Sequence, residues 1–285
     1  MSTMVVKTIV SRANAAGLYS ISADETTDKQ RKVDLALGIR YVHEMQAKER
    51  VISVVDLQQR DGDFIARVVL NQLETHDLPT DRLVSQTHDG ASVMSGKRKG
   101  VQAIISKTLQ RDVPYIHCFA HQLHLVVMWT MKSSEEVVAF FDHIQALTAL
   151  LKKSQARDVY EGKLLRRLLD QRWSGHHDAV VSFLANMSDI WEMLETLSSS
   201  SGESEIRRDA GILQHGLTPK MLFVATTLDK IFAHLEPLNR MLQAQKLEFS
   251  AAMSILHATE VQLRRCCRKG AADGFPASPS RKGSE

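Results

Sequence analysis

Three strand-like runs follow one another between residues 17 and 58, and they restrict the fold more than any other feature of the chain. The runs are GLYSISAD (17–24), VDLALGIRYVH (33–43) and RVISVVDLQ (50–58). The first two alternate between apolar and polar residues, and the third is β-branched and apolar, which is typical of strands. Because only short polar stretches separate them, the three runs predict an antiparallel meander.

The pattern then changes to alternating helices and strands. A helix, a strand, a helix, a strand and a long helix are predicted over residues 61–79, 83–87, 99–110, 113–118 and 120–154. Three consecutive strands followed by this alternation favour an α/β fold, a mixed sheet flanked by helices. We expect residues 1–155 to form this sheet domain.

From residue 156 onward the chain shows helical periodicity only. We expect an all-helical region over 156–268. Residues 269–285 are rich in Gly, Ser and Pro and predict a disordered tail. Trp129 and Trp191 fall in apolar stripes of helical segments, so we expect both in the core.

The composition excludes several classes of protein. No apolar run approaches the roughly 20 residues of a membrane-spanning helix, and the N-terminus does not resemble a signal peptide. The chain has only 3 cysteines, which points to a reducing compartment. A net charge of +3 permits contact with DNA but does not demand it. We therefore expect a nuclear or cytosolic protein with no membrane contact.

Two predicted strands end on an aspartate, Asp24 and Asp89. In this strand order the first strand is central and the fourth can lie beside it, so the two carboxylates would adjoin. Adjacent carboxylates do not both stay ionised unless a positive charge lies between them. A divalent ion such as Mg²⁺ would supply that charge and would suit phosphoryl transfer. The alternative is that each aspartate only caps a turn or the next helix.

Four motifs occur in order between residues 23 and 180, within a stretch of similarity from about residue 15 to about residue 265: ADETTD, HDGASVMSGKRKGVQA, YIHCFAHQLHLVV and DQRWSGHHDAV. With these motifs the chain resembles the transposases of the hAT superfamily of DNA transposons. More narrowly, it resembles the transposon-derived proteins of the zinc finger MYM-type 1-like and DUF4371 group. The resemblance implies an RNase H-like core, with residues 156–268 as part of a helical insertion domain.

The resemblance also implies roles for individual residues near the catalytic centre. Asp24 and Asp89 match the first and second catalytic aspartates, which would hold Mg²⁺ or Mn²⁺. Cys118 and His121 match a Cys-x-x-His motif that lies near the active centre. In this family the reaction is metal-dependent DNA strand cleavage and transfer.

Two further sets of residues are candidates for DNA binding. Arg172 and Trp173 match the Arg-Trp motif of the family, whose tryptophan handles a flipped base. Lys97, Arg98 and Lys99 form a cationic stretch close to Asp89 in the sequence and would suit the DNA backbone. The alternative for these three is a solvated loop at the start of a helix.

The segment HCFAHQLH offers possible ligands for zinc in His117, Cys118, His121 and His124. A predicted strand ends at Cys118 and splits the set, and structural zinc sites usually draw ligands from two separate segments. A packed cysteine with hydrogen-bonded histidines beside the active centre is the alternative that we favour.

The chain departs from the family pattern in three respects. No glutamate stands in a motif that matches the third catalytic acid, since Glu236, Glu248 and Glu260 fall in helices of the expected insertion. No cysteine precedes Cys118, so a zinc finger cannot be formed before it, and the C-terminal dimerisation region is not recognisable. We therefore expect a truncated relative.

Three functions follow from this pattern. The first is a transposase-like protein whose ancestral strand-transfer reaction this chain does not complete. The second is a non-catalytic nuclear scaffold that binds DNA or protein partners. The third is a chain without stable function, because an incomplete helical region would expose apolar surface.

Overall fold

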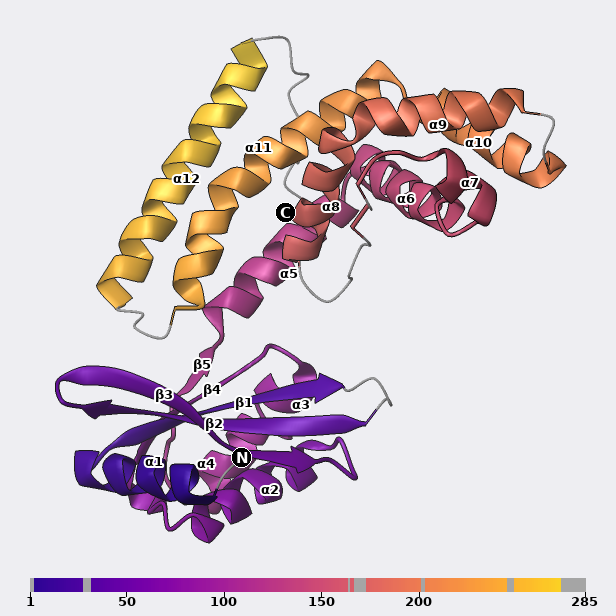
Figure 1. Cartoon of the computed structure of the whole chain (residues 1–285). Coiled ribbons are helices and arrows are strands. Elements are labelled where there is room, and N and C mark those ends of the chain that lie inside the picture. The colour runs from indigo at the N-terminus through magenta and orange to yellow at the C-terminus, as the bar shows by residue number, and fades with distance from the viewer. Residues whose placement is uncertain are drawn as a thin grey trace. The chain divides into compact units, whose positions relative to one another are not determined.

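The computed structural model describes residues 3–27, 32–163, 165–166, 173–200, 203–244 and 249–272 (Figure 1). The chain divides into two compact units. The sheet unit comprises Met1–Leu123 and Leu242–Glu248, and the helical unit comprises His124–Met241 and Phe249–Glu285. The expected domain ranges 1–155, 156–268 and 269–285 stay predictions, and the end of the expected tail, 273–285, lies outside the described residues.

The sheet unit contains a mixed five-stranded sheet in the order β3-β2-β1-β4-β5. Its strands are β1 (Tyr19–Thr27), β2 (Val33–His43), β3 (Gln46–Asp56), β4 (Leu83–His88) and β5 (Tyr115–His117). Strands β1 to β3 pair as an antiparallel meander, β4 pairs in parallel with β1, and β5 pairs in parallel with β4. The predicted fold class, a mixed sheet flanked by helices with a helical region after it, is confirmed.

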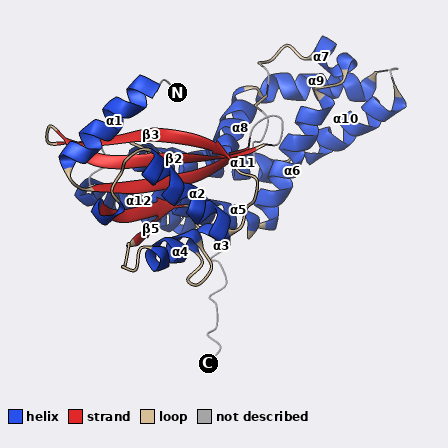
Figure 2. Cartoon of the chain, turned by 90° about the horizontal axis from the view of Figure 1, so that it is seen from below, coloured by secondary structure: helices blue, strands red, loops and turns tan. Residues whose placement is uncertain are grey.

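Three helices cover one face of this sheet (Figures 1 and 2). They are α1 (Thr3–Ala16), α2 (Gly62–Thr75) and α4 (Val101–Thr108); the short α3 (Ser92–Ser95) and the 3₁₀ turn η1 (Thr80–Arg82) lie in connections. Alternate residues of a strand share a face, and Ile21, Leu37 and Ile39 are accordingly buried together with Ile65 and Val69 of α2.

The helical unit is built from helices joined by short connections. They are α5 (Phe119–Lys132), α6 (Glu135–Leu150), α7 (Ser154–Val159), α8 (Trp173–Ala185), α9 (Met187–Ser199), α10 (Ser204–Gly216), α11 (Pro219–Leu242) and α12 (Phe249–Ala272). Helix α5 begins in the sheet unit and continues into the helical unit. Among the described residues, no helix is long and apolar enough to cross a membrane.

The predicted long helix over 120–154 is wrong in one respect, because it is interrupted at Ser133 and Ser134. The Oγ of Ser134 accepts a hydrogen bond from the backbone N–H of Val137 at 3.4 Å and caps a new helix, α6. A serine satisfies a free N–H at a helix start better than it serves a helix interior.

The expectation that two tryptophans lie in the core is also wrong. Trp129 is 65% exposed and Trp191 is 44% exposed. In each helix the buried face belongs to neighbouring apolar residues, Val127 and Met131 in α5 and Ile190 and Leu194 in α9. The apolar stripe of each helix is wider than the face that is buried. Periodicity alone therefore assigned Trp129 and Trp191 to the buried face, although both rings are exposed.

Candidate active site

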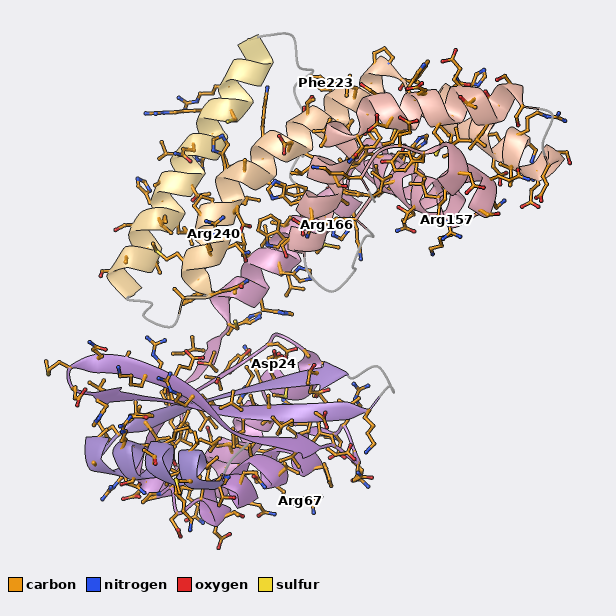
Figure 3. All side chains as sticks on the ribbon, in the orientation of Figure 1. Asp24, Arg67, Arg157, Arg166, Phe223 and Arg240 are labelled. Carbon is orange, nitrogen blue, oxygen red and sulfur yellow. The ribbon has the colours of Figure 1, made fainter. Side chains whose placement is uncertain are left out.

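Asp24 and Asp89 extend from the same edge of the sheet because β1 and β4 run parallel. Ser22 of β1 and Thr87 of β4 are the last paired residues, and each aspartate stands two positions beyond its strand's member of that pair. The parallel register therefore places the backbones of Asp24 and Asp89 equally far beyond the last paired residues of β1 and β4. Figure 3 labels Asp24 on its strand.

The expectation that Asp24 ends its strand is wrong. Strand β1 continues to Thr27, because its antiparallel partner β2 extends beyond this point and pairs Asp24 with Ala36. Only the parallel pairing with β4 stops before Asp24. Asp24 is exposed, whereas Asp89 follows β4 directly and is half-buried.

Glu25 is an acidic neighbour that the sequence analysis does not single out. Burial raises the pKa of Glu25, the positive charge of Arg60 opposes this, and the negative charges of Asp89 and Asp24 raise the pKa further. The Oε2 of Glu25 lies 3.5 Å from Nη2 of Arg60. Both aspartates are thus close enough to act on one group. Successive side chains of a strand leave on opposite faces, so Glu25 and Asp24 do not share a face.

Asp89 also forms the turn that the sequence offered as its alternative role. Its Oδ1 accepts a hydrogen bond from the backbone N–H of Ala91 at 3.2 Å. This is an Asx turn, in which a short carboxylate stabilises the backbone after it. The turn leads into α3, and the hydroxyl of Ser95 donates to the carbonyl oxygen of Gly90 at 3.0 Å. Because the turn orients the Asp89 carboxylate, the role of Asp89 in the turn is compatible with a role as a metal ligand.

A buried polar pair lies on β4 just before the candidate site. The Nε2 of Gln86 donates to the carbonyl oxygens of Gln102 and Val113 at 3.0 and 2.9 Å. Its Oε1 lies 3.1 Å from Nε2 of His88. Burial lowers the pKa of His88 to about 4, against a weaker opposing effect of the Ala23 backbone and Asp89. His88 is therefore neutral at neutral pH.

Lys97, Arg98 and Lys99 lie in the connection between α3 and α4, and all three are exposed. The connection packs tightly against the start of α2, since a Cβ on Gly62 would collide with the carbonyl oxygen of Lys99. A cationic loop in a fixed position within the sheet unit is thus available to a polyanion.

The geometry of this unit accords with a comparison of sequences. A family model described as DUF4371, the RNase-like domain of ZMYM1/FAM200, matches residues 1–100. The sheet unit is similar to this RNase-like domain. The matched segment includes Asp24, Asp89 and the loop Lys97–Lys99, and it ends before β5.

The Cys-x-x-His pair lies beyond the segment that matches the RNase-like domain. Cys118 follows β5, is half-buried, and donates its backbone N–H to the carbonyl oxygen of His88 at 3.1 Å. The ring centroids of His121 and His117 are 5.8 Å apart. His124 belongs to the helical unit, where its Nδ1 accepts a hydrogen bond from the backbone N–H of Trp173 at 3.1 Å.

Within the ranges that the structure describes, no three His, Cys, Asp or Glu side chains are grouped closely enough to hold a metal ion. The pair Asp24 and Asp89 therefore stands as two carboxylates rather than as a closed ligand set. Carboxylate oxygens are the ligands that Mg²⁺ and Mn²⁺ take, with waters and substrate phosphates completing the shell. The donor chemistry of the pair fits such an ion.

Of the expected Arg-Trp motif, Arg172 lies outside the described residues. Trp173 begins α8 and is only 2% exposed. Its ring centroid lies 5.5 Å from that of Phe232 and 6.5 Å from that of His177. The role of Arg172 and Trp173 in DNA binding stays a prediction, and Trp173 is packed in the helical unit in this conformation.

Proposed function

We propose that the chain derives from a hAT-type transposase and that its sheet unit keeps a divalent-ion site for contact with DNA phosphates. The observation that supports this most directly is the shared level of Asp24 and Asp89 on the parallel strands β1 and β4. Two carboxylates brought together at this edge of the sheet would favour a cation between them. Asp24 and Asp89 would hold the ion, and the chemistry that Mg²⁺ or Mn²⁺ would supply there is activation of a water or a 3′ hydroxyl and stabilisation of charge on the phosphate.

The loop Lys97–Lys99 supports contact with DNA in the same unit. Its three exposed cations would neutralise backbone phosphates without reading sequence. We infer that the loop directs the DNA backbone towards the two aspartates. On the resemblance to hAT transposases, Arg172 and Trp173 would bind DNA outside this unit, and the protein would work in the nucleus.

We propose further that this chain does not complete strand cleavage and transfer by itself. The proposed site has two carboxylates, those of Asp24 and Asp89, and among the described residues no three His, Cys, Asp or Glu side chains are grouped closely enough to hold a metal ion. A nuclear scaffold that binds DNA or a protein is therefore the second candidate function. A cut-and-paste assay with the purified chain separates the two, since any strand transfer would contradict the scaffold.

The first test is Mn²⁺ binding by calorimetry. We expect the wild-type chain to bind and the double variant Asp24→Asn/Asp89→Asn not to bind. A matched control is Asp77→Asn/Asp112→Asn, because both residues are exposed and precede β4 and β5, at the opposite ends of these strands. The control removes the same charge and should bind Mn²⁺ like the wild type. Equal heats for all three proteins would contradict a site at Asp24 and Asp89.

The second test is the salt dependence of DNA binding, measured by fluorescence anisotropy with a duplex oligonucleotide. Each phosphate contact contributes roughly 0.9 to the slope of log K against log salt concentration. The variant Lys97→Gln/Arg98→Gln/Lys99→Gln loses up to three of these contacts. The magnitude of its slope should therefore be smaller by up to about 2.7. The Asp24→Asn/Asp89→Asn variant should still bind, because it keeps the cations. An unchanged slope in the triple variant would contradict the role of the loop.

A further inference from the structure

We propose that Tyr115 is a positioning residue for Asp89. The Tyr115 side chain holds the turn that keeps Asp89, directly after β4, at the position equivalent to that of Asp24 on β1. The inference rests on the proposed function of the Asp24 and Asp89 pair. Tyr115 begins β5, where it is paired with Gln86 of β4. Its side chain reaches along β4 to the end of that strand.

The contact is a direct hydrogen bond to the backbone of Asp89. The Tyr115 hydroxyl donates to the carbonyl oxygen of Asp89 at 2.8 Å, and the carbonyl oxygen of His88 lies at 3.5 Å. The shorter distance is the ordinary one for a hydroxyl donor. Burial, then the charges of Asp89 and Cys118, raise the pKa of Tyr115. The phenol therefore keeps its proton, and its donor role, well above neutral pH.

The ring of Tyr115 is itself held in place. It stacks on His88, with centroids 6.0 Å apart and planes at 19°, and on His117, with centroids 6.4 Å apart and planes at 22°. A tyrosine has few rotatable bonds, so contact of the Tyr115 ring with two neighbouring rings restricts the position of its hydroxyl. The hydroxyl can then fix the turn.

His117 restrains the same turn from a second direction. A Cβ on Gly90 would collide with the His117 ring, with Nε2 at 2.6 Å. The backbone of β5 adds a third restraint, since the Cys118 N–H donates to the carbonyl oxygen of His88 at 3.1 Å. Strand β5 thus holds the segment His88–Gly90 through a hydroxyl, a ring and a backbone bond. Only the hydroxyl can be removed by a change as small as Tyr115→Phe.

The test compares two Tyr→Phe variants of the full chain. Tyr115→Phe removes the hydroxyl that contacts Asp89. Tyr19→Phe is the matched control, because its hydroxyl also donates to a backbone carbonyl, that of Pro79 at 3.2 Å, away from the candidate site. Binding of Mn²⁺ is followed by the electron paramagnetic resonance signal of the free ion. We expect Tyr115→Phe to weaken Mn²⁺ affinity by roughly 2- to 10-fold, the worth of one hydrogen bond, and Tyr19→Phe to leave it unchanged.

A second readout reports the turn without any metal. The Ala91 amide donates to Asp89 Oδ1, so its hydrogen exchange, measured by NMR, reports how well the Asx turn is held. We expect faster exchange at Ala91 in Tyr115→Phe than in the wild type or Tyr19→Phe.

The possible results separate the inference from the proposed function. If Asp24→Asn/Asp89→Asn abolishes binding while Tyr115→Phe binds like the wild type, the positioning role is wrong and the metal site stands. If the wild type binds no Mn²⁺ at these aspartates, the proposed metal site is wrong, and Ala91 exchange alone decides whether Tyr115 holds the turn. Unchanged exchange would then overturn the inference.

A second variant tests the same turn from the His117 side. Gly90→Ala should weaken Mn²⁺ affinity because its methyl group meets the His117 ring. Gly90→Ala/His117→Ala removes the collision and should bind like His117→Ala alone. If the double variant binds Mn²⁺ as weakly as Gly90→Ala, the collision with the His117 ring is not the cause of the weaker binding.

Discussion

The two units stabilise their interiors with different side chains. In the sheet unit the polar residues Gln86 and His88 are fully enclosed and joined by a hydrogen bond, beside a core that is mostly aliphatic. The helical unit also encloses polar side chains, among them His176 and Asn186. In the helical unit, aromatic rings meet at the centre, with Phe140 and Phe183 in an edge-to-face contact at 5.6 Å. A hydrogen bond fixes direction, whereas apolar contact is non-directional. The unit with the buried polar pair is also the one that carries Asp24 and Asp89.

This comparison suggests that the units respond differently to substitution. The helical unit should lose most stability when a ring is removed. The sheet unit should be sensitive to acid through His88 and to loss of the Gln86 amide, because a buried polar atom without its partner is costly.

Removal of a central ring should have the largest effect. Phe183 is 0% exposed, and we expect Phe183→Ala to lower the free energy of unfolding by about 3–5 kcal/mol, since the truncation leaves a cavity. Urea unfolding followed by circular dichroism measures this. Phe223→Ala is the control in the same unit, because Phe223 is 49% exposed and should change stability by only about 0.5 kcal/mol. Similar losses for both variants would show that the cluster around Phe183 is not the core of this unit.

Acid should destabilise the sheet unit through His88. Its pKa is about 4 in the folded chain and 6.5 when unfolded, so between these values only the unfolded state binds the proton. Stability must then rise with pH in this window and fall as the pH drops from 6.5 towards 4. One pKa unit corresponds to about 1.4 kcal/mol, so the full loss is about 3 kcal/mol. Unfolding measured from pH 4 to 7 with a chelator present tests this.

The matched variants assign the acid effect to a unit. His88→Gln should flatten the pH dependence of unfolding, although it also lowers stability at pH 7. Burial also lowers the pKa of His143 in the helical unit. The variant His143→Gln should therefore also flatten the pH dependence of unfolding. If His88→Gln retains the full slope of the wild type, His88 is not the group that titrates.

The sequence predicted most of the sheet unit because its signals are local. Alternating and β-branched apolar residues located β1 to β3. The helical unit was predicted less well. The cap at Ser134 was overlooked, and the exposure of Trp129 depends on which helices pack against α5, which periodicity does not specify.

The candidate site was predictable only in part. The strand order places Asp24 and Asp89 at one level, and this followed from the pattern of elements. Glu25 and Tyr115 were not found, because their contacts join residues that are far apart in the sequence. Tyr115 contacts Asp89 across 26 positions. The motif YIH gave a possible signal, since alternate residues Tyr115 and His117 share a face of β5.

Loss of the Gln86 amide should have an intermediate effect on stability. Gln86→Leu keeps a similar volume but leaves the carbonyl oxygens of Gln102 and Val113 without this donor. We expect a loss of about 2–3 kcal/mol, because buried acceptors lose their partner. Gln58→Leu is the control, since Gln58 is exposed and its amide donates to the exposed carboxylate of Asp56 at 3.1 Å. Equal stability of the two variants would show that the polar pair does not hold β4.

The smallest predicted effect compares one helix cap from each unit. Asp61 Oδ1 accepts from the Phe64 N–H at 2.9 Å in the sheet unit, and Ser134 Oγ accepts from the Val137 N–H at 3.4 Å in the helical unit. Loss of a cap costs about 1 kcal/mol. Since the bond of Asp61 is shorter and charged, and a carboxylate is favoured at a helix N-terminus, Asp61→Ala should lower stability more than Ser134→Ala. Urea unfolding of the two variants beside Asp61→Asn and Ser134→Thr, which keep an acceptor, measures this. A larger loss of stability in Ser134→Ala than in Asp61→Ala would mean that the start of α6 depends on its cap more than the start of α2 does.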